Sequence, residues 1–162
     1  MPPPVRPDLA QLLFLIDTAY DRVSWHGPNL RGSLRGVTPR QAAWRPGPKR
    51  HNIWELIVHA AYWKYAAWRR LTGATRGSFA LEGSNWFVRD GASVRALRAD
   101  IDLLDRTHRT LREAVAALDP RQLDRRPPKG TATTRALVTG VAAHDLYHAG
   151  QIQLLKRLGG KT

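Results

Sequence analysis

The sequence predicts an all-α protein, a four-helix bundle with a long crossover between its first and second helices. Four segments, each about 18 to 26 residues long, carry apolar residues spaced by three and four positions, as in helices that bury one face. No segment shows the strict alternation that is typical of a half-buried strand. A length of 162 residues suits a single domain over residues 1–162, with one hydrophobic core.

The first predicted helix spans about residues 8–25, with Asp8 as its N-cap. Its apolar stripe consists of Leu9, Leu12, Leu13, Ile16, Tyr20 and Val23. The connection that follows, residues 26–52, contains four glycines and four prolines, which favour a loop over a helix. This connection is long enough to cross the bundle. Within it, Thr38 and Pro39 predict one short helical turn.

Three further helices are predicted at residues 53–71, 93–118 and 133–158. Asn52 is placed to cap the first of them, and Glu55 is expected to complete a capping box with its carboxylate in solvent. The 93–118 segment has apolar residues in a heptad pattern, which is typical of helices that pack nearly parallel. Two glycines directly after the last helix end it.

Composition and charge narrow the classes of function. The net charge of +13 and the pI near 11.3 favour nucleic-acid binding, but 21 of the 26 basic residues are arginines scattered along the chain, without a block of five. We therefore expect a solvated basic surface and no specific nucleic-acid partner. No segment is apolar enough to span a membrane or to form a signal peptide, so a cytoplasmic location is expected. Because the chain has no cysteine, histidine, aspartate, glutamate or water must supply the ligands of any metal.

Two histidines four residues apart, His144 and His148, share one predicted inward stripe of the last helix. This spacing lets two imidazoles bind one metal ion, although two core histidines with separate hydrogen-bond partners would show the same spacing. The pair alone leaves both interpretations open. His59, at the inner edge of the 53–71 helix, adds a third imidazole. Three nitrogen ligands leave one coordination position for water or substrate, as in catalytic zinc sites.

The motifs around these histidines resemble those of the DinB/YfiT-like superfamily. The resemblance is carried by "IWELIVHAAYW" at residues 53–63 and "AAHDLYHAGQIQLLKRL" at residues 142–158, and it covers nearly the whole chain. It implies a four-helix bundle with a crossover after the first helix. It also implies a divalent metal, zinc most often and nickel as the alternative, held at positions that match His59, His144 and His148.

Other residues are candidates for the surroundings of the site. His108 lies on the heptad seam, where a buried histidine bonded to an acceptor is favoured over a ligand or proton shuttle. His26 is a candidate for the mouth of the site, Gln151 shares the histidine stripe and is placed to orient a ligand, and His51 is expected on the surface. The aromatic candidates for pocket walls are Trp25, Trp63, Trp86 and Tyr147, although aromatic side chains in bundles more often belong to the core.

Three functions are compatible with these sequence features. The resemblance includes proteins that transfer a low-molecular-weight thiol to small electrophiles and proteins described as metal-dependent hydrolases. A metal with three neutral ligands suits either, because it lowers the pKa of a bound thiol or water. We favour thiol S-transfer with a small-molecule substrate. A non-catalytic stress protein with weak, nonspecific nucleic-acid binding is the third alternative, and a homodimer is left open as the assembly.

Overall fold

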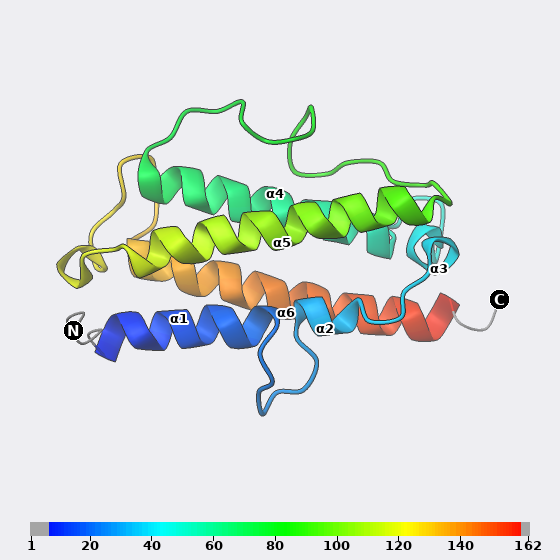
Figure 1. The fold of residues 1–162 in the computed structure, drawn as a ribbon, viewed down its shortest axis with the longest axis horizontal. Helices are drawn as coiled ribbons and strands as arrows, with labels where there is room; N and C mark the ends of the chain where they lie inside the picture. The colour runs from blue at the N-terminus through cyan, green and yellow to red at the C-terminus, as the bar shows by residue number, and fades with distance from the viewer. Residues whose placement is uncertain (1–6, 160–162) are drawn as a thin grey trace.

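A computed structural model describes residues 7–159, which fold into an all-helical structure without a strand in that range (Figure 1). The helices are α1 (Pro7–Tyr20), α2 (Leu30–Ser33), α3 (Pro39–Ala43), α4 (Ile53–Thr72), α5 (Val94–Ala116) and α6 (Thr134–Gly159), with a 3-10 turn at Pro120–Gln122. The all-α prediction is confirmed. No helix of the described residues is long and apolar enough to cross a membrane.

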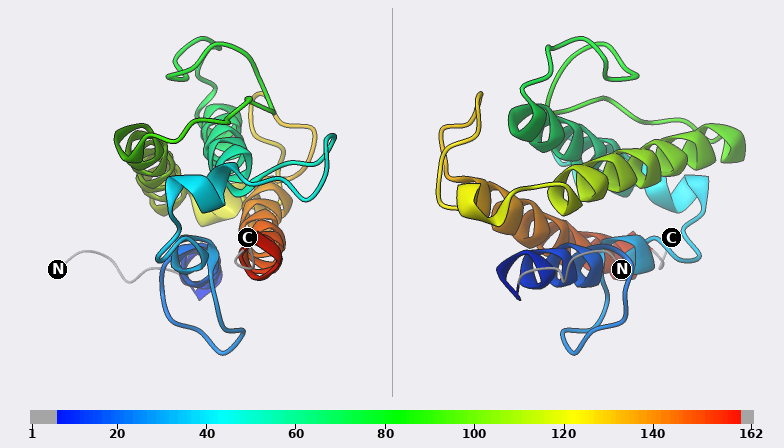
Figure 2. Two further views of the ribbon diagram at one scale, coloured as in Figure 1. Left: turned by 90° about the vertical axis from the view of Figure 1, so that its right-hand side faces the viewer. Right: turned by 60° about the vertical axis from the view of Figure 1, so that its left-hand side comes forward.

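The four longest helices lie at the corners of a roughly square cross-section. α4 and α1 each pack against both α5 and α6, which places α1 and α4 on one diagonal (Figure 2). Residues 21–52 carry α2 and α3 past one end of the bundle and bring the chain to the start of α4. Residues 73–93 then run back along the length of the bundle, so that α4 and α5 run in the same direction (Figure 1). This return loop covers one side of α4.

The first helix is shorter than its sequence pattern predicted. It ends at Tyr20, and the side chains of Val23 and Trp25 are fully exposed in the loop that follows. Gly27, at a φ of 90°, turns this loop, and Asn29 closes it by donating from Nδ2 to the carbonyl of Arg22. Asn29 also caps α2, a short helix that the sequence analysis did not predict and that lies nearly in line with α1 (Figure 1).

The other long helices begin and end within two residues of their predicted bounds. Asn52 caps α4 by accepting a hydrogen bond of 2.8 Å from the backbone N–H of Glu55, and Ser93 caps α5 in the same way. Gly73 ends α4 in a left-handed conformation. The prediction that the Glu55 carboxylate is solvated is wrong. It is buried, and it accepts hydrogen bonds from the side chains of Arg45 and His51.

The core consists of two apolar clusters with a polar layer between them. Along α4, α5 and α6, this layer contains Lys64, His108 and Asp145, each flanked on its helix by residues of both clusters. Lys64 and Asp145 form an ion pair in which each side chain is only 1% exposed. His108 stacks on Tyr20 with ring centroids 3.6 Å apart. Among the described residues, nothing hydrogen-bonds the buried Nδ1 of His108 or Oδ1 of Asp145.

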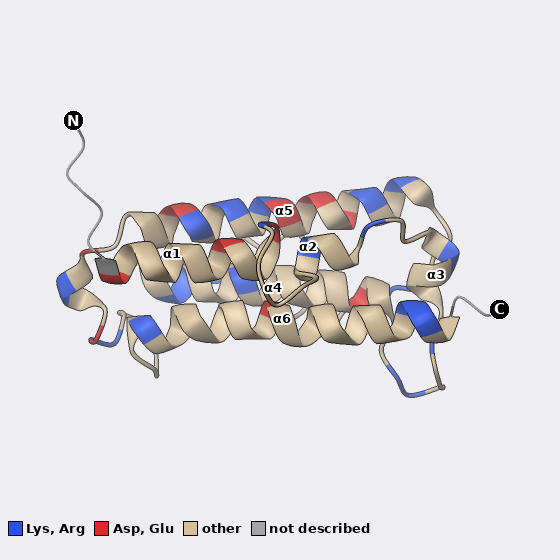
Figure 3. Ribbon diagram, turned by 90° about the horizontal axis from the view of Figure 1, so that it is seen from below, with Lys and Arg blue, Asp and Glu red and all other residues tan. Residues whose placement is uncertain are grey.

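Basic residues are spread over the surface of the bundle. Figure 3 shows lysine and arginine on several helices and at both ends of the molecule, with acidic residues between them on α5. Several of these arginines are paired with carboxylates, for example Arg112 with Asp17 and Arg135 with Asp124. This spread of basic residues is what the scattered arginines in the sequence led us to expect.

Candidate metal centre

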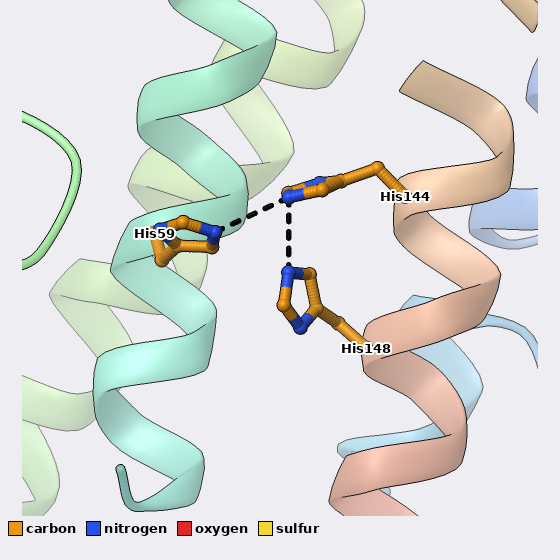
Figure 4. Close-up of side chains that lie close together, drawn as sticks. All are labelled: His59, His144 and His148. Atoms are coloured by element: carbon orange, nitrogen blue, oxygen red, sulfur yellow. Dashed lines mark hydrogen bonds between the residues drawn. The ribbon is translucent and has the colours of Figure 1, made fainter. Parts of the chain in front are cut away.

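Three imidazole rings meet between α4 and α6. His59 extends from the first half of α4, while His144 and His148 extend from successive turns near the middle of α6 (Figure 4). The Nε2 atom of His144 lies 3.2 Å from Nε2 of His59 and 2.9 Å from Nε2 of His148. His59 and His148 are buried and His144 is half-buried. The fold therefore brings together all three histidines that the sequence analysis named as ligands.

The remaining ring nitrogens show which atoms carry the protons. The Nδ1–H of His59 donates a hydrogen bond of 2.8 Å to the backbone carbonyl of Asn85, and the Nδ1–H of His148 donates one of 2.6 Å to Oε1 of Gln151. A neutral imidazole has one N–H, so the Nε2 atoms of His59 and His148 carry lone pairs. His144 has at most one proton on Nε2, so it cannot donate a linear hydrogen bond to both neighbours. The three Nε2 atoms are therefore arranged to donate lone pairs to one shared cation.

Burial keeps these rings neutral. It lowers the pKa of His144 to about 3, and the nearby His148 and His59 add to this effect. It lowers the pKa of His148 to about 4, against the opposing hydrogen bond to Gln151. The pKa of His59 is also lowered, mainly by burial. Because only a neutral imidazole binds a metal, the site is in its binding form at neutral pH.

The donor set fits a divalent transition metal. Within the described residues, the candidate ligand atoms of His59, His144 and His148 lie within 4.8 Å of one another, and the group includes no carboxylate. Imidazole nitrogen suits zinc and nickel, whereas magnesium and calcium prefer oxygen. Acceptors on the far ring nitrogens, as found here for His59 and His148, are usual for metal-binding histidines. This buried group could therefore bind a divalent metal.

Comparison with known proteins agrees with this geometry. The model of the DinB superfamily matches residues 22–152, a range that includes all three histidines. The chain belongs to the DinB superfamily. No curated protein and no solved structure matches the chain significantly. Helix α1 lies outside the matched range, whereas α2 to α5 and most of α6 lie within it.

The buried face of α6 in this DinB-superfamily protein is rotated from the predicted one. It is centred on Asp145 and Ile152, so His144 lies at its edge beside α4. Trp63 and Tyr147 lie next to the histidines. The ring of Trp63 is 6.3 Å from that of His59, and the ring of Tyr147, which is largely exposed, is 5.1 Å from that of His148. These two aromatic side chains border the site.

Three other candidates lie away from the histidine group of this DinB-superfamily protein. Trp25 is fully exposed in the loop after α1, so the prediction that it walls a pocket is wrong. His26 lines a groove on the opposite face of α6, together with Leu146, and its Nε2 is 3.2 Å from the carbonyl oxygen of Thr18. His108 is buried as predicted, but it stacks on Tyr20 instead of bonding to an acceptor through Nδ1.

The return loop of this DinB-superfamily chain contributes to the site in a way that the sequence pattern did not predict. Asn85 provides the acceptor for His59, and Trp86, considered only as a wall, stacks on the His59 ring at 3.8 Å. Asn85 has a positive φ of 65°, a conformation in which asparagine is enriched. This preference indicates a turn, but it does not indicate that the turn meets His59. His51, expected on the surface, is half-exposed and stacks on the same indole.

Proposed function

We propose that this protein binds one divalent ion, zinc by preference, through His59, His144 and His148, and that it transfers a low-molecular-weight thiol to a small electrophile. The observation that carries the proposal is the convergence of three Nε2 atoms, two of which are left unprotonated by the hydrogen bonds of their Nδ1–H groups. Nickel is the alternative ion, because imidazole ligands suit both metals.

The chemistry follows from the charge of the donor set. Three neutral ligands leave the full charge of a divalent ion uncompensated, and such an ion acts as a Lewis acid that lowers the pKa of a bound thiol or water. The protein's own part is to keep the three rings neutral and oriented. Trp63 and Tyr147 place aromatic surface beside them, which suits a small apolar electrophile.

Two features favour a thiol over water as the nucleophile. A thiol has an ordinary pKa of about 8.5, far below that of water, so a divalent ion alone suffices to ionise it near neutral pH. The second feature is that hydrolysis would need a nearby general base to accept the proton of the attacking water. The carboxylates closest in sequence to the ligands are occupied, since Glu55 is bound by Arg45 and Asp145 by Lys64. The chain has no cysteine, so the thiol must be a separate molecule.

The test has two stages. Elemental analysis of the purified protein should find about one zinc or nickel ion per chain, as one three-histidine site requires. The cobalt-substituted protein should then develop a sulfur-to-metal charge-transfer band on titration with a small thiol, and a panel of electrophiles should reveal metal-dependent conjugation. Metal-dependent ester or amide hydrolysis without such a band would assign a hydrolase instead. A protein that binds no metal would overturn the proposal.

A further inference from the structure

The end of the return loop, residues 85–89, lies along the first half of α4. Asn85 is beside His59 and Trp63, and four residues later Arg89 is beside the start of the helix. The carbonyl of Arg89 accepts a hydrogen bond of 2.6 Å from Nδ2 of Asn52, the residue that caps α4. The segment is therefore attached to α4 at both of its ends.

Asn85 makes two contacts that bear on the metal centre. Its backbone carbonyl accepts the Nδ1–H of His59 at 2.8 Å, and its side-chain Oδ1 accepts the Nε1–H of Trp63 at 2.9 Å. The left-handed conformation of Asn85, at a φ of 65°, belongs to the turn that presents both groups to α4. Asparagine tolerates this conformation, whereas a β-branched residue does not.

The indole of Trp86 stacks on the face of the His59 ring. The indole lies parallel to the His59 ring with centroids 3.8 Å apart, and parallel to the His51 ring with centroids 3.5 Å apart. Two rings at such distances occupy opposite faces of the indole, because they would overlap on one face. His51 is itself held by a hydrogen bond of 2.8 Å to the buried Glu55. The stack thus connects His59 to a fixed carboxylate on its own helix.

We propose that Asn85 and Trp86 are positioning residues of the metal centre. Asn85 keeps the proton of His59 on Nδ1, and Trp86 fixes the plane of the ring, so that Nε2 stays directed at the site shared with His144 and His148. This inference rests on the proposed function for the role of the site, but the tautomer of His59 can be measured without metal. The carbonyl of Asn85 is occupied by the Nδ1–H of His59, and the indole of Trp86 meets His59 by its ring face, so both residues act on the metal site through His59.

Two substitutions of Asn85 separate its conformation from its side chain. Asn85→Gly retains the left-handed conformation and the carbonyl, and it removes only the contact with Trp63. Asn85→Val disfavours that conformation and displaces the carbonyl. We expect Asn85→Val to lower zinc affinity about 10- to 100-fold, the usual effect of losing an outer partner of a ligand, and Asn85→Gly to stay close to the wild type. Trp86→Ala should lower the affinity about 10-fold, and Trp86→Phe should restore most of it.

The measurements are zinc affinity by competition with a chelator and the ¹⁵N spectrum of histidine side chains in the metal-free protein. The spectrum should show His59 protonated on Nδ1 in the wild type and Asn85→Gly, and a changed tautomer population in Asn85→Val. Val88→Ala, a change at an exposed side chain of the same loop, is the matched control, and circular dichroism checks folding. Wild-type His59 protonated on Nε2 would overturn the proposal, as would wild-type affinity in both Asn85→Val and Trp86→Ala. If the wild type has His59 protonated on Nδ1 but binds no metal, the proposed function is refuted instead.

Discussion

The Nδ1–H of His148 donates a hydrogen bond of 2.6 Å to Oε1 of Gln151, three residues further along α6. This contact makes Gln151 the acceptor that leaves Nε2 of His148 free for a metal. We expect Gln151→Ala to weaken zinc binding about 10- to 100-fold. Gln151→Glu should retain binding, because a carboxylate accepts the same hydrogen bond. Chelator competition measures both, and an alanine variant with wild-type affinity would contradict the assignment.

The three histidines should each be required for metal binding. Replacing His59, His144 or His148 by alanine removes one of three donors, and we expect zinc affinity to fall by at least ~100-fold, more than for an outer partner. Elemental analysis after dialysis should find little metal in these variants. His26→Ala is the matched control. His26 is in the loop after α1 and lies against the face of α6 opposite the metal site, so its substitution should leave the metal content unchanged. A His59→Ala protein with full stoichiometry would show that α4 supplies no ligand.

Much of this architecture could be predicted from the sequence, and the exceptions have physical reasons. α4, α5 and α6 were located to within two residues because their apolar periodicity ends at clear caps such as Asn52 and Ser93. The predicted first helix was too long because Val23 continues the periodicity, although its side chain is fully exposed. Helical spacing and the family resemblance identified the three histidines. The acceptor for His59 could not be predicted, because Asn85 reaches it through a loop path that no periodicity encodes.

The buried pair of Lys64 and Asp145 should matter greatly when only one partner is removed. Lys64→Met leaves a buried carboxylate without its counter-ion, and we expect the free energy of unfolding to fall by about 3–5 kcal/mol. Combining Lys64→Met with Asp145→Leu should recover most of this loss, because two apolar side chains replace both charges. Urea denaturation of the metal-free proteins gives the comparison. A double variant less stable than either single variant would show that the pair itself stabilises the core.

His108 should make stability depend on pH in the acidic range. Burial, with the nearby charges of Lys64 and Arg112, lowers the pKa of His108 from 6.5 to about 2. The unfolded chain therefore binds this proton first, and the stabilisation present above pH 6.5 is lost as the pH falls toward 2. The difference in unfolding free energy between the wild type and His108→Phe should change by up to about 1.4 kcal/mol per pH unit below pH 6.5. A difference independent of pH would show that the fold leaves the pKa of His108 at its unfolded value.

The basic surface should bind nucleic acid only weakly. A net charge of +13 attracts phosphate, but among residues 7–159 the lysines and arginines are spread over several helices, with acidic residues between them on α5 (Figure 3). We expect binding to duplex DNA that is independent of sequence and that decreases steeply between 50 and about 200 mM salt, as counterion release requires. Fluorescence anisotropy with two unrelated duplexes tests this. A tight, sequence-selective complex at physiological salt would favour the nucleic-acid-binding alternative.

Lys64 and Asp145 join the same two helices that His59 and His144 join, and Asp145 directly follows His144 in the chain. The ion pair therefore fixes the register of α4 against α6 along their axes. A slide of one helical turn, about 5.4 Å, would separate the two charges and the two imidazoles together. An apolar layer in place of the pair tolerates such a slide, because methylene groups have no fixed partner. An apolar replacement of the pair can therefore recover stability and still loosen the register of α4 against α6, and such a variant would hold its metal less well.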